Sequence, residues 1–172
     1  MCIRDSTGTP RRIWGPGIAM DTASEGTVLR DLDAFLARHG DLHGQADLKP
    51  RSANYVARMD TWFVDYDVMV EGIPVWRGGV TARIKHGNLI MLGLETYPRT
   101  LLEGERRIDL DTARKAAVSQ GPAPAAMHDP GQARLVWLPQ EVAGGVVLQL
   151  VWEVRSETYK PCLLYTSDAA DE

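Results

Sequence analysis

Residues 62–93 read WFVDYDVMVEGIPVWRGGVTARIKHGNLIMLG, and this stretch decides the fold. Apolar side chains recur at every second position from Trp62 to Val70, which is the period of a strand that has one face against a core. Two aspartates, Asp65 and Asp67, fall on the opposite face. The alternation resumes over residues 80–84, and a more apolar run follows at 89–94. The stretch therefore predicts a meander of three antiparallel strands.

Two breaks separate these strands. We expect Gly72 and Pro74 to end the first ladder at a corner, because glycine permits a positive φ and proline has no N–H to donate. The second break is the turn signal His86-Gly87-Asn88. Neither break contains a residue pattern that indicates chemistry.

The two ends of the chain can be encoded by inverted copies of one DNA element. Residues 1–6 can be written ATG TGT ATA AGA GAC AG followed by a pyrimidine. The reverse complement, C TGT CTC TTA TAC ACA T, encodes residues 162–166 and begins the codon of Ser167. This match resembles translated sequencing-library adapter. We therefore expect residues 1–6 and 162–172 to be artefactual and residues 7–161 to be the natural segment.

Leaving out these ends changes what composition can indicate. The formal charge of −4 becomes −1, because three acidic residues leave with the tail while Arg4 and Asp5 cancel. A near-neutral balance gives no electrostatic case for nucleic acid or an anionic membrane. No apolar run reaches the ~20 residues of a membrane span. Both cysteines lie in the excluded ends, so they do not indicate a redox compartment.

One helix is predicted before the meander. Thr22 or Ser24 can cap it, and it should run to about His39 with Gly40 as its stop. Four apolar residues share one face of this helix: Val28, Leu32, Phe35 and Leu36. We expect residues 7–20 to be extended or irregular with Trp14 as an anchor, and 41–49 to be a polar connector. Residues 54–59 could form a first strand.

The second half repeats the order of helix and then strands. Residues 101–107 are expected to be a charged link, and Asp109 or Asp111 can cap a helix to about Ser119. Its small-residue packing face comprises Ala113, Ala116, Ala117 and Val118. Residues 134–138 and 145–155 predict a hairpin. We predict an α+β fold of two small units, 7–95 and 96–161, each a helix packed on an antiparallel sheet.

Few residue patterns suggest catalysis or a cofactor. His39 and His43 have the spacing of two metal ligands on a helix, but Gly40 should end the helix between them, so we favour a solvated helix end. His128-Asp129 in a Pro/Gly-rich loop is read as a turn. The five tryptophans are read as core or strand-face residues, because basic residues do not cluster around them. We expect no enzyme activity, no metal and no cofactor in this segment.

Two successive motifs carry a family resemblance. Residues 70–84, VEGIPVWRGGVTARI, followed by His86-Gly87-Asn88-Leu89, resemble the fungalysin/thermolysin propeptide motif. Residues 108–117, 135–139 and 150–155 are similar to the PepSY domain that commonly follows it. Together they cover most of residues 47–158. The PepSY-like unit ends before its usual closing strand, so we expect it to be truncated.

The resemblance implies the N-terminal propeptide of a secreted, thermolysin-like zinc metallopeptidase. Such propeptides chaperone the folding of their own catalytic domain and inhibit it until they are cleaved off. On this reading Gly72, Ile73, Pro74, Val75 and Trp76 form a rigid corner, with Gly87 in the following turn. The corner orders the meander and faces the peptidase, or it simply packs internally. A standalone PepSY-type binding or regulatory protein of the cell envelope is the alternative, and a small enzyme of cystatin-like fold is a third class.

Overall fold

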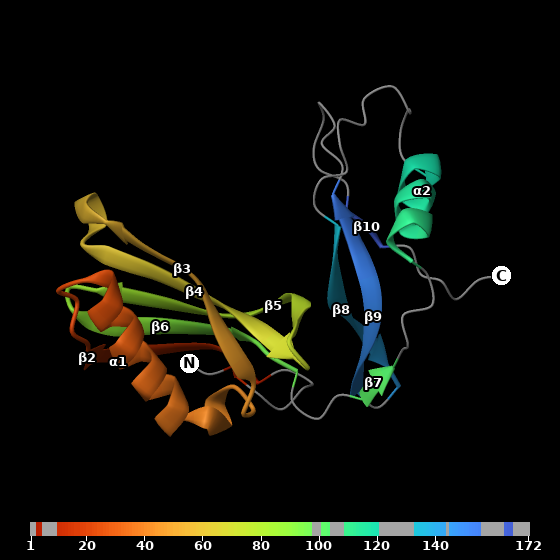
Figure 1. Ribbon diagram of the computed structural model, residues 1–172. Coiled ribbons are helices and arrows are strands. Elements are labelled where there is room, and N and C mark those ends of the chain that lie inside the picture. Colours follow the sequence, from red (N-terminus) through yellow and green to blue (C-terminus); the bar gives the residue numbers. More distant parts are fainter. Residues whose placement is uncertain are drawn as a thin grey trace.

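The computed structural model describes residues 3–4, 10–97, 101–103, 109–120, 133–143, 145–155 and 164–166, and it has an α+β fold (Figure 1). Five antiparallel strands lie side by side in this order: β2 (Pro10–Ala19), β6 (Asn88–Glu95), β5 (Ile73–Lys85), β4 (Thr61–Val70) and β3 (Asp47–Val56). Helix α1 (Glu25–Arg38) covers one face of these strands.

Helix α1 follows the prediction closely. Ser24 is its N-cap: the Ser24 hydroxyl accepts from the Thr27 N–H at 3.2 Å, and the Thr27 hydroxyl accepts from the Ser24 N–H at 3.0 Å. The four predicted stripe residues are the buried residues of the helix. The stop differs, because Gly40 does not take a left-handed conformation and instead begins the short 3-10 helix η1 (Gly40–Leu42).

The stripe of α1 packs on the alternating face of the meander. We call this cluster the α1 core, and its sheet residues include Val64, Val80, Ala82 and Leu94, each at most 1% exposed. Tyr66 lies in the same cluster and donates its hydroxyl to Asp33 of α1 at 2.7 Å. Burial raises the pKa of the Tyr66 hydroxyl, and the hydrogen bond to Asp33 raises it further. The burial of alternate residues in these strands confirms the predicted strand period.

The two turns of the meander are tight. Glu71-Gly72 have φ of 50° and 76°, and His86-Gly87 have φ of 48° and 69°, the positive values of a two-residue hairpin turn whose twist matches the strands. The prediction that Pro74 lies in a break was wrong, since Pro74 belongs to β5 and is paired with Met69 of β4. The break in the ladder comes after Pro74.

That break is a large bulge in β5. Asp67 pairs with Gly79 and Met69 pairs with Pro74, so residues 75–78 lie opposite Val68 alone. Arg77 has a positive φ of 56° inside the bulge. At this point β6 no longer flanks β5, and Val75 instead pairs in parallel with Trp137 of strand β8 (Ala133–Val142).

The remaining strands continue from β8. Strand β9 (Gly145–Arg155) pairs with β8 as the predicted hairpin. Strand β7 (Leu101–Glu103) pairs with β9 in parallel, and β10 (Leu164–Thr166) pairs with it antiparallel. The sheet is therefore mixed rather than purely antiparallel, and β7 occupies part of the expected charged link. Helix α2 (Leu110–Gln120) is capped by Asp109, whose carboxylate accepts from the Thr112 N–H at 2.7 Å.

A second apolar cluster, which we call the Trp137 core, joins two parts of the fold: the first region, α1 with strands β2 to β6, and the second region, α2 with strands β7 to β9. Its buried members are Val68 and Val75 from β4 and β5, and Trp137 and Leu148 from β8 and β9. The Trp137 indole N–H donates to the Val70 carbonyl at 3.0 Å. In the second region α2 buries Ala113 as predicted, while His128-Asp129 and the side chains of Ala117 and Val118 fall outside the described residues.

Three expectations for the first region needed correction. Residues 10–19 form a strand, the extended one of the two expected conformations, with an irregularity between Trp14 and Ile18, but Trp14 is 48% exposed rather than an anchor. The first strand of the sheet starts at Asp47 inside the expected connector, and a 3-10 helix η2 (Ala57–Met59) follows it. Strand β1 (Ile3–Arg4) pairs with β2. By their residue numbers, β1 and β10 both belong to the ends that we read as adapter-derived. Neither α1 nor α2 is long and apolar enough to cross a membrane.

Candidate functional site

The predicted corner residues lie at the junction of the two regions. Ile73 packs against the Trp137 core and Val75 is part of it, so these two pack internally. Gly72 is exposed in the β4–β5 turn, and Trp76 is half-buried with the Arg77 guanidinium 4.3 Å from its ring centroid. Gly87 lies in the turn at the other end of β5, near Met20 and Thr22. The structure therefore brings residues 73–76 together and leaves Gly87 apart.

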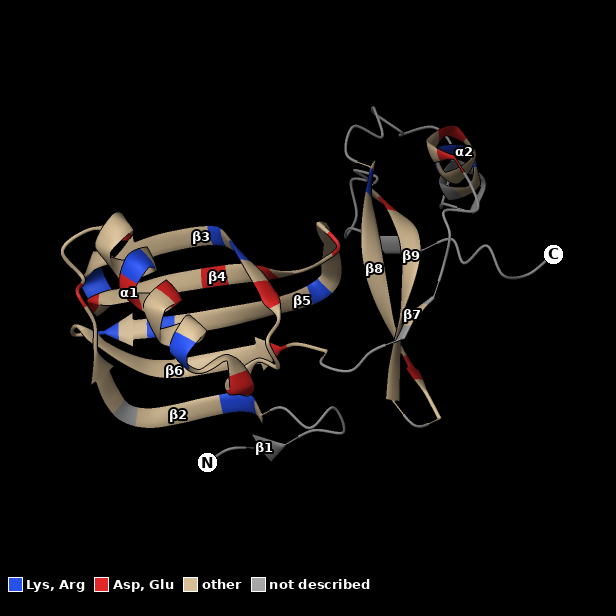
Figure 2. Cartoon of the chain, turned by 60° about the horizontal axis from the view of Figure 1, so that its bottom comes forward, with Lys and Arg blue, Asp and Glu red and all other residues tan. Residues whose placement is uncertain are grey.

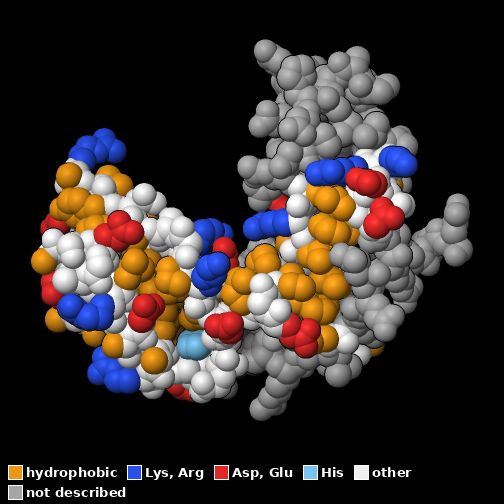
Figure 3. Space-filling view, in the orientation of Figure 1, with side chains coloured by type: hydrophobic (Ala, Val, Ile, Leu, Met, Phe, Trp, Pro, Cys, Tyr) orange, Lys and Arg blue, Asp and Glu red, His pale blue; other side chains and the backbone are white. Residues whose placement is uncertain are grey.

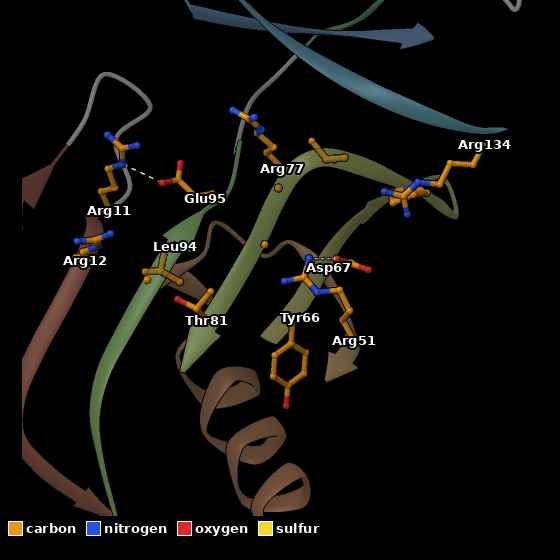
Figure 4. Close-up of a pocket in the computed structure, with 15 residues that line it drawn as sticks. Arg11, Arg12, Arg51, Tyr66, Asp67, Arg77, Thr81, Leu94, Glu95 and Arg134 are labelled. Atoms are coloured by element: carbon orange, nitrogen blue, oxygen red, sulfur yellow. Dashed lines mark hydrogen bonds and ion pairs between the residues drawn. The ribbon is translucent and has the colours of Figure 1, made fainter. Parts of the chain in front are cut away.

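A pocket beside this junction is the candidate site (Figure 4). Its volume is about 220 Å³, and it lies where β5 leaves its ladder with β4. Five arginines line it, and we call it the arginine-rimmed pocket: Arg11 and Arg12 from β2, Arg51 from β3, Arg77 from β5 and Arg134 from β8. Figure 4 shows Arg11 and Arg12 on one side, Arg51 on the other, and Arg77 and Arg134 toward β8.

Part of the pocket wall is nearly free of side chains. Gly93 pairs with Arg12 on one side and Thr81 on the other, and Gly79 pairs with Asp67 and Glu95. A Cβ at Gly93 would lie 2.6 Å from the Thr81 hydroxyl oxygen, and one at Gly79 would lie 2.6 Å from the Tyr66 carbonyl oxygen. An added Cβ would thus meet backbone at Gly79 and the Thr81 hydroxyl at Gly93, so this part of the wall consists of backbone and the small Thr81 side chain.

The arginines are only partly neutralised. Arg51 pairs with Asp67 at 3.0 Å and Arg11 pairs with Glu95 at 2.9 Å. Arg134 has a third carboxylate partner, Glu153, outside the lining, so two of the five arginines have no carboxylate partner among the described residues, in a chain of net charge −4. Figure 2 shows basic segments of β2 and β5 at the strand ends nearest the β8–β9 hairpin, and Figure 3 shows Lys and Arg side chains beside the notch between the two regions.

Arg134 has a structural role as well. It donates to Glu153 of β9 at 2.5 Å, and Glu153 is only 3% exposed. Removing Arg134 would leave a buried carboxylate without this partner, which is costly. The Arg12 side chain, by contrast, has no hydrogen bond or ion pair with any residue that the structure describes.

The two histidines that could have formed a metal pair lie in different environments. His39 is exposed and its ring lies 4.6 Å from the Phe35 ring. His43 is 6% exposed, and its Nε2 lies 3.1 Å from the Leu36 carbonyl. His43 is thus a buried residue, not part of a solvated helix end. Within the described ranges, no group of three or more His, Cys, Asp or Glu side chains could hold a metal ion.

A polar cluster lies at the far end of the sheet. His86 Nδ1 lies 2.6 Å from one Asp60 carboxylate oxygen, and the Tyr55 hydroxyl donates to the other at 2.9 Å. The hydrogen bond from His86, and then that from Tyr55, lowers the pKa of Asp60. Asp60 has φ of 45°, and the Tyr55 side chain is among the exposed hydrophobic ones. We interpret the cluster as structural: it holds the η2–β4 connection against the β5–β6 turn.

No local sequence signal marks the arginine-rimmed pocket. Its arginines are spread from residue 11 to residue 134 and meet only because of strand order. The net charge of the chain, −4, also gave no indication of a local group of arginines. One basic residue, the adjacent Arg77, covers the ring of Trp76. Of the five tryptophans only Trp137 is buried.

The chain was also compared with known proteins. No family model matches it, and no curated protein is similar enough to suggest a function.

Proposed function

We propose that this chain is the non-catalytic propeptide of a secreted, thermolysin-like metallopeptidase. In this role it chaperones the folding of the catalytic domain in cis and inhibits it until cleavage. Residues 7–95 and 96–161 would act as two linked units, the first carrying the propeptide motif and the second the PepSY-like segment. The adapter-derived reading of residues 1–6 and 162–172 belongs to the same proposal.

The contact between the two motifs carries this proposal. The GIPV segment, residues 72–75, and the LVWLP segment, residues 135–139, were singled out as separate motifs from the sequence. In the fold Val75 pairs with Trp137, and the Trp137 indole N–H donates to the Val70 carbonyl at 3.0 Å. A shared core between the two segments supports reading them as parts of one functional module rather than as chance matches.

A module of this kind needs surface rather than catalytic side chains. Strand edges and patches of complementary charge can bind a partner protein without any catalytic side chain. The arginines of the pocket lining suit the binding of a partner's acidic groups.

The deciding experiment is recovery of the complete gene. An in-frame H-E-x-x-H segment downstream of the codon for Pro161 is the expected result. A stop codon there would contradict the proposal and favour the standalone cell-envelope protein.

Inhibition then tests the corner. The catalytic domain from that gene is assayed with residues 7–161 added in trans, as wild type and as Trp76→Ala, at matched folded fraction. We expect wild type to inhibit and Trp76→Ala to inhibit less well. Equal inhibition constants would remove Trp76 from the contact, and no inhibition by either protein would contradict the inhibitor role.

A further inference from the structure

The arginine-rimmed pocket combines three features of a ligand site. It has a volume of about 220 Å³, a glycine-lined wall and an excess of positive charge. The paired arginines remain accessible: the side chains of Arg11, Arg51 and Arg134 are 61%, 55% and 51% exposed. Arg12 and Arg77 are exposed as well.

The resident ion pairs indicate which ligand group fits. Asp67 meets Arg51 and Glu95 meets Arg11 at 2.9–3.0 Å, so carboxylates already reach these guanidinium groups in hydrogen-bonding geometry. Arg51 uses only one nitrogen for Asp67, and no other hydrogen bond from it to a described residue exists. A guanidinium has five N–H donors, so further carboxylates can be bound at the rim.

The spacing of the arginines favours an extended ligand. They come from four strands, β2, β3, β5 and β8, and surround the pocket instead of converging on one point. The volume is several times the ~30 Å³ of one water, more than a single small anion fills. Alternate side chains of an extended peptide lie ~7 Å apart on one side, and can therefore reach different arginines.

We propose that the arginine-rimmed pocket is a recognition site for an acidic peptide segment of a partner protein. The peptide backbone lies along the wall formed by Gly79 and Gly93, where the only intervening side chain among the described lining residues is the small Thr81. Its carboxylates are bound by Arg12 and Arg77, which lack a carboxylate partner among the described residues, and by the free donors of Arg51. This inference does not depend on the partner being a metallopeptidase.

The test uses synthetic peptides and the full chain. Binding of a hexapeptide that alternates Asp and Ser is measured by isothermal titration calorimetry, beside the same peptide with Asn in place of Asp. We expect the Asp peptide alone to bind. Arg12→Glu and Arg77→Glu should each weaken it about tenfold, the effect of losing a charged hydrogen bond.

Arg58→Glu is the matched control, because Arg58 is an exposed residue of η2 outside the pocket and the substitution changes net charge by the same amount. It should leave the affinity within twofold of wild type. Circular dichroism and the thermal midpoint verify that each variant is folded. Raising the salt from about 0.01 M to 0.15 M should weaken binding, since screening shortens the Debye length from ~30 to ~8 Å.

Three outcomes would overturn the proposal. The Asn peptide could bind as tightly as the Asp peptide, or Arg58→Glu could weaken binding as much as the pocket variants, which would leave only a net-charge effect. Inorganic phosphate could compete as well as the peptide at equal concentration, which would make the pocket a small-anion site. None of these measurements involves a peptidase, so they are independent of the inhibition assay.

Discussion

The two regions of the molecule bury their apolar surface in different ways. The α1 core contains twelve buried residues, all from α1 and the strands β4, β5 and β6. The Trp137 core contains four, and two of them, Val68 and Val75, come from the first region. The β8–β9 hairpin therefore depends on β4 and β5 for half of this cluster, whereas the α1 core takes none of its buried members from the hairpin. Disruption of the first region should propagate to the second more than the reverse.

The largest expected effect follows from removing a side chain from the α1 core. Phe35→Ala should lower the free energy of unfolding by ~3–5 kcal/mol, because Phe35 is 6% exposed and its loss leaves a cavity. Leu29→Ala, at a partly buried position of the same helix, is the control and should cost less. Urea unfolding followed by circular dichroism measures both. An unchanged midpoint for Phe35→Ala would mean that the stripe does not hold the helix on the sheet.

A smaller and more local effect is expected from Trp137→Phe. This change removes the indole N–H that binds the Val70 carbonyl, at a cost of ~1–3 kcal/mol. Hydrogen exchange should report lost protection in β8 and β9 while α1 and β6 stay protected. Trp14→Phe, at a tryptophan that is 48% exposed, should change neither region. Equal loss of protection throughout the chain would show that the two regions unfold as one.

The sequence predicted the first region better for a physical reason. A strand with one buried face has apolar residues at alternate positions, so the meander could be located from the sequence. Helix α1 could be located because it has an N-cap residue and a stripe of apolar residues. Strand β3 was missed at its start because it is an edge strand, where polar residues and Pro50 cost little. Strand β2 was left undecided between extended and irregular backbone because of Gly15-Pro16-Gly17, and an irregularity between Trp14 and Ile18 accommodates these residues.

The candidate site could not be predicted at all. Pro74 indicated a corner at that position. Whether Pro74 breaks the ladder or pairs within it depends on the register between β4 and β5, and that register places the bulge at residues 75–78. The five pocket arginines have no common spacing. Their proximity is a product of strand order, and strand order is set by long-range packing.

A third prediction compares two glycines of the first region. Gly72→Ala should destabilise by ~1 kcal/mol, because φ is 76° there and alanine resists that conformation, although nothing lies within 4 Å of the added Cβ. Gly26→Ala should stabilise by ~0.5 kcal/mol, since Gly26 lies in α1 without a positive φ. Thermal unfolding measures both. A stabilising Gly72→Ala would contradict the assigned turn and with it the link between β4 and β5.

The smallest effects concern one aspartate in each region. Hydrogen bonds from His86 and Tyr55 lower the pKa of Asp60, and the Thr112 backbone N–H and then its side chain lower that of Asp109. A carboxyl with a lowered folded pKa stabilises the fold above its unfolded value of ~3.9, and that contribution is lost as pH falls through the folded pKa. Asp60→Asn and Asp109→Asn should therefore be less stable than wild type at pH 7.

Acid should remove this difference. Each gap from wild type in the urea midpoint should narrow on acidification below about pH 4, since protonation then deprives wild type of the same carboxylate. Asparagine also tolerates the left-handed conformation of residue 60, so Asp60→Asn tests charge rather than backbone strain. A gap of constant size at pH 7 and pH 3 would indicate that the hydrogen bonds, not the charge, carry the effect.

The position of β2 has a kinetic consequence. Strands β4, β5 and β6 follow one another through two-residue turns, so their pairing closes short loops. Pairing of β2 with β6 joins Ile13 to Leu92, and pairing of β5 with β8 joins Val75 to Trp137. Contacts of such sequence separation lose much chain entropy before they contribute any attraction, and they slow folding. We expect the meander to form first, with β2 and the β8–β9 hairpin adding late, so that the rim of the arginine-rimmed pocket is assembled only in the last steps of folding.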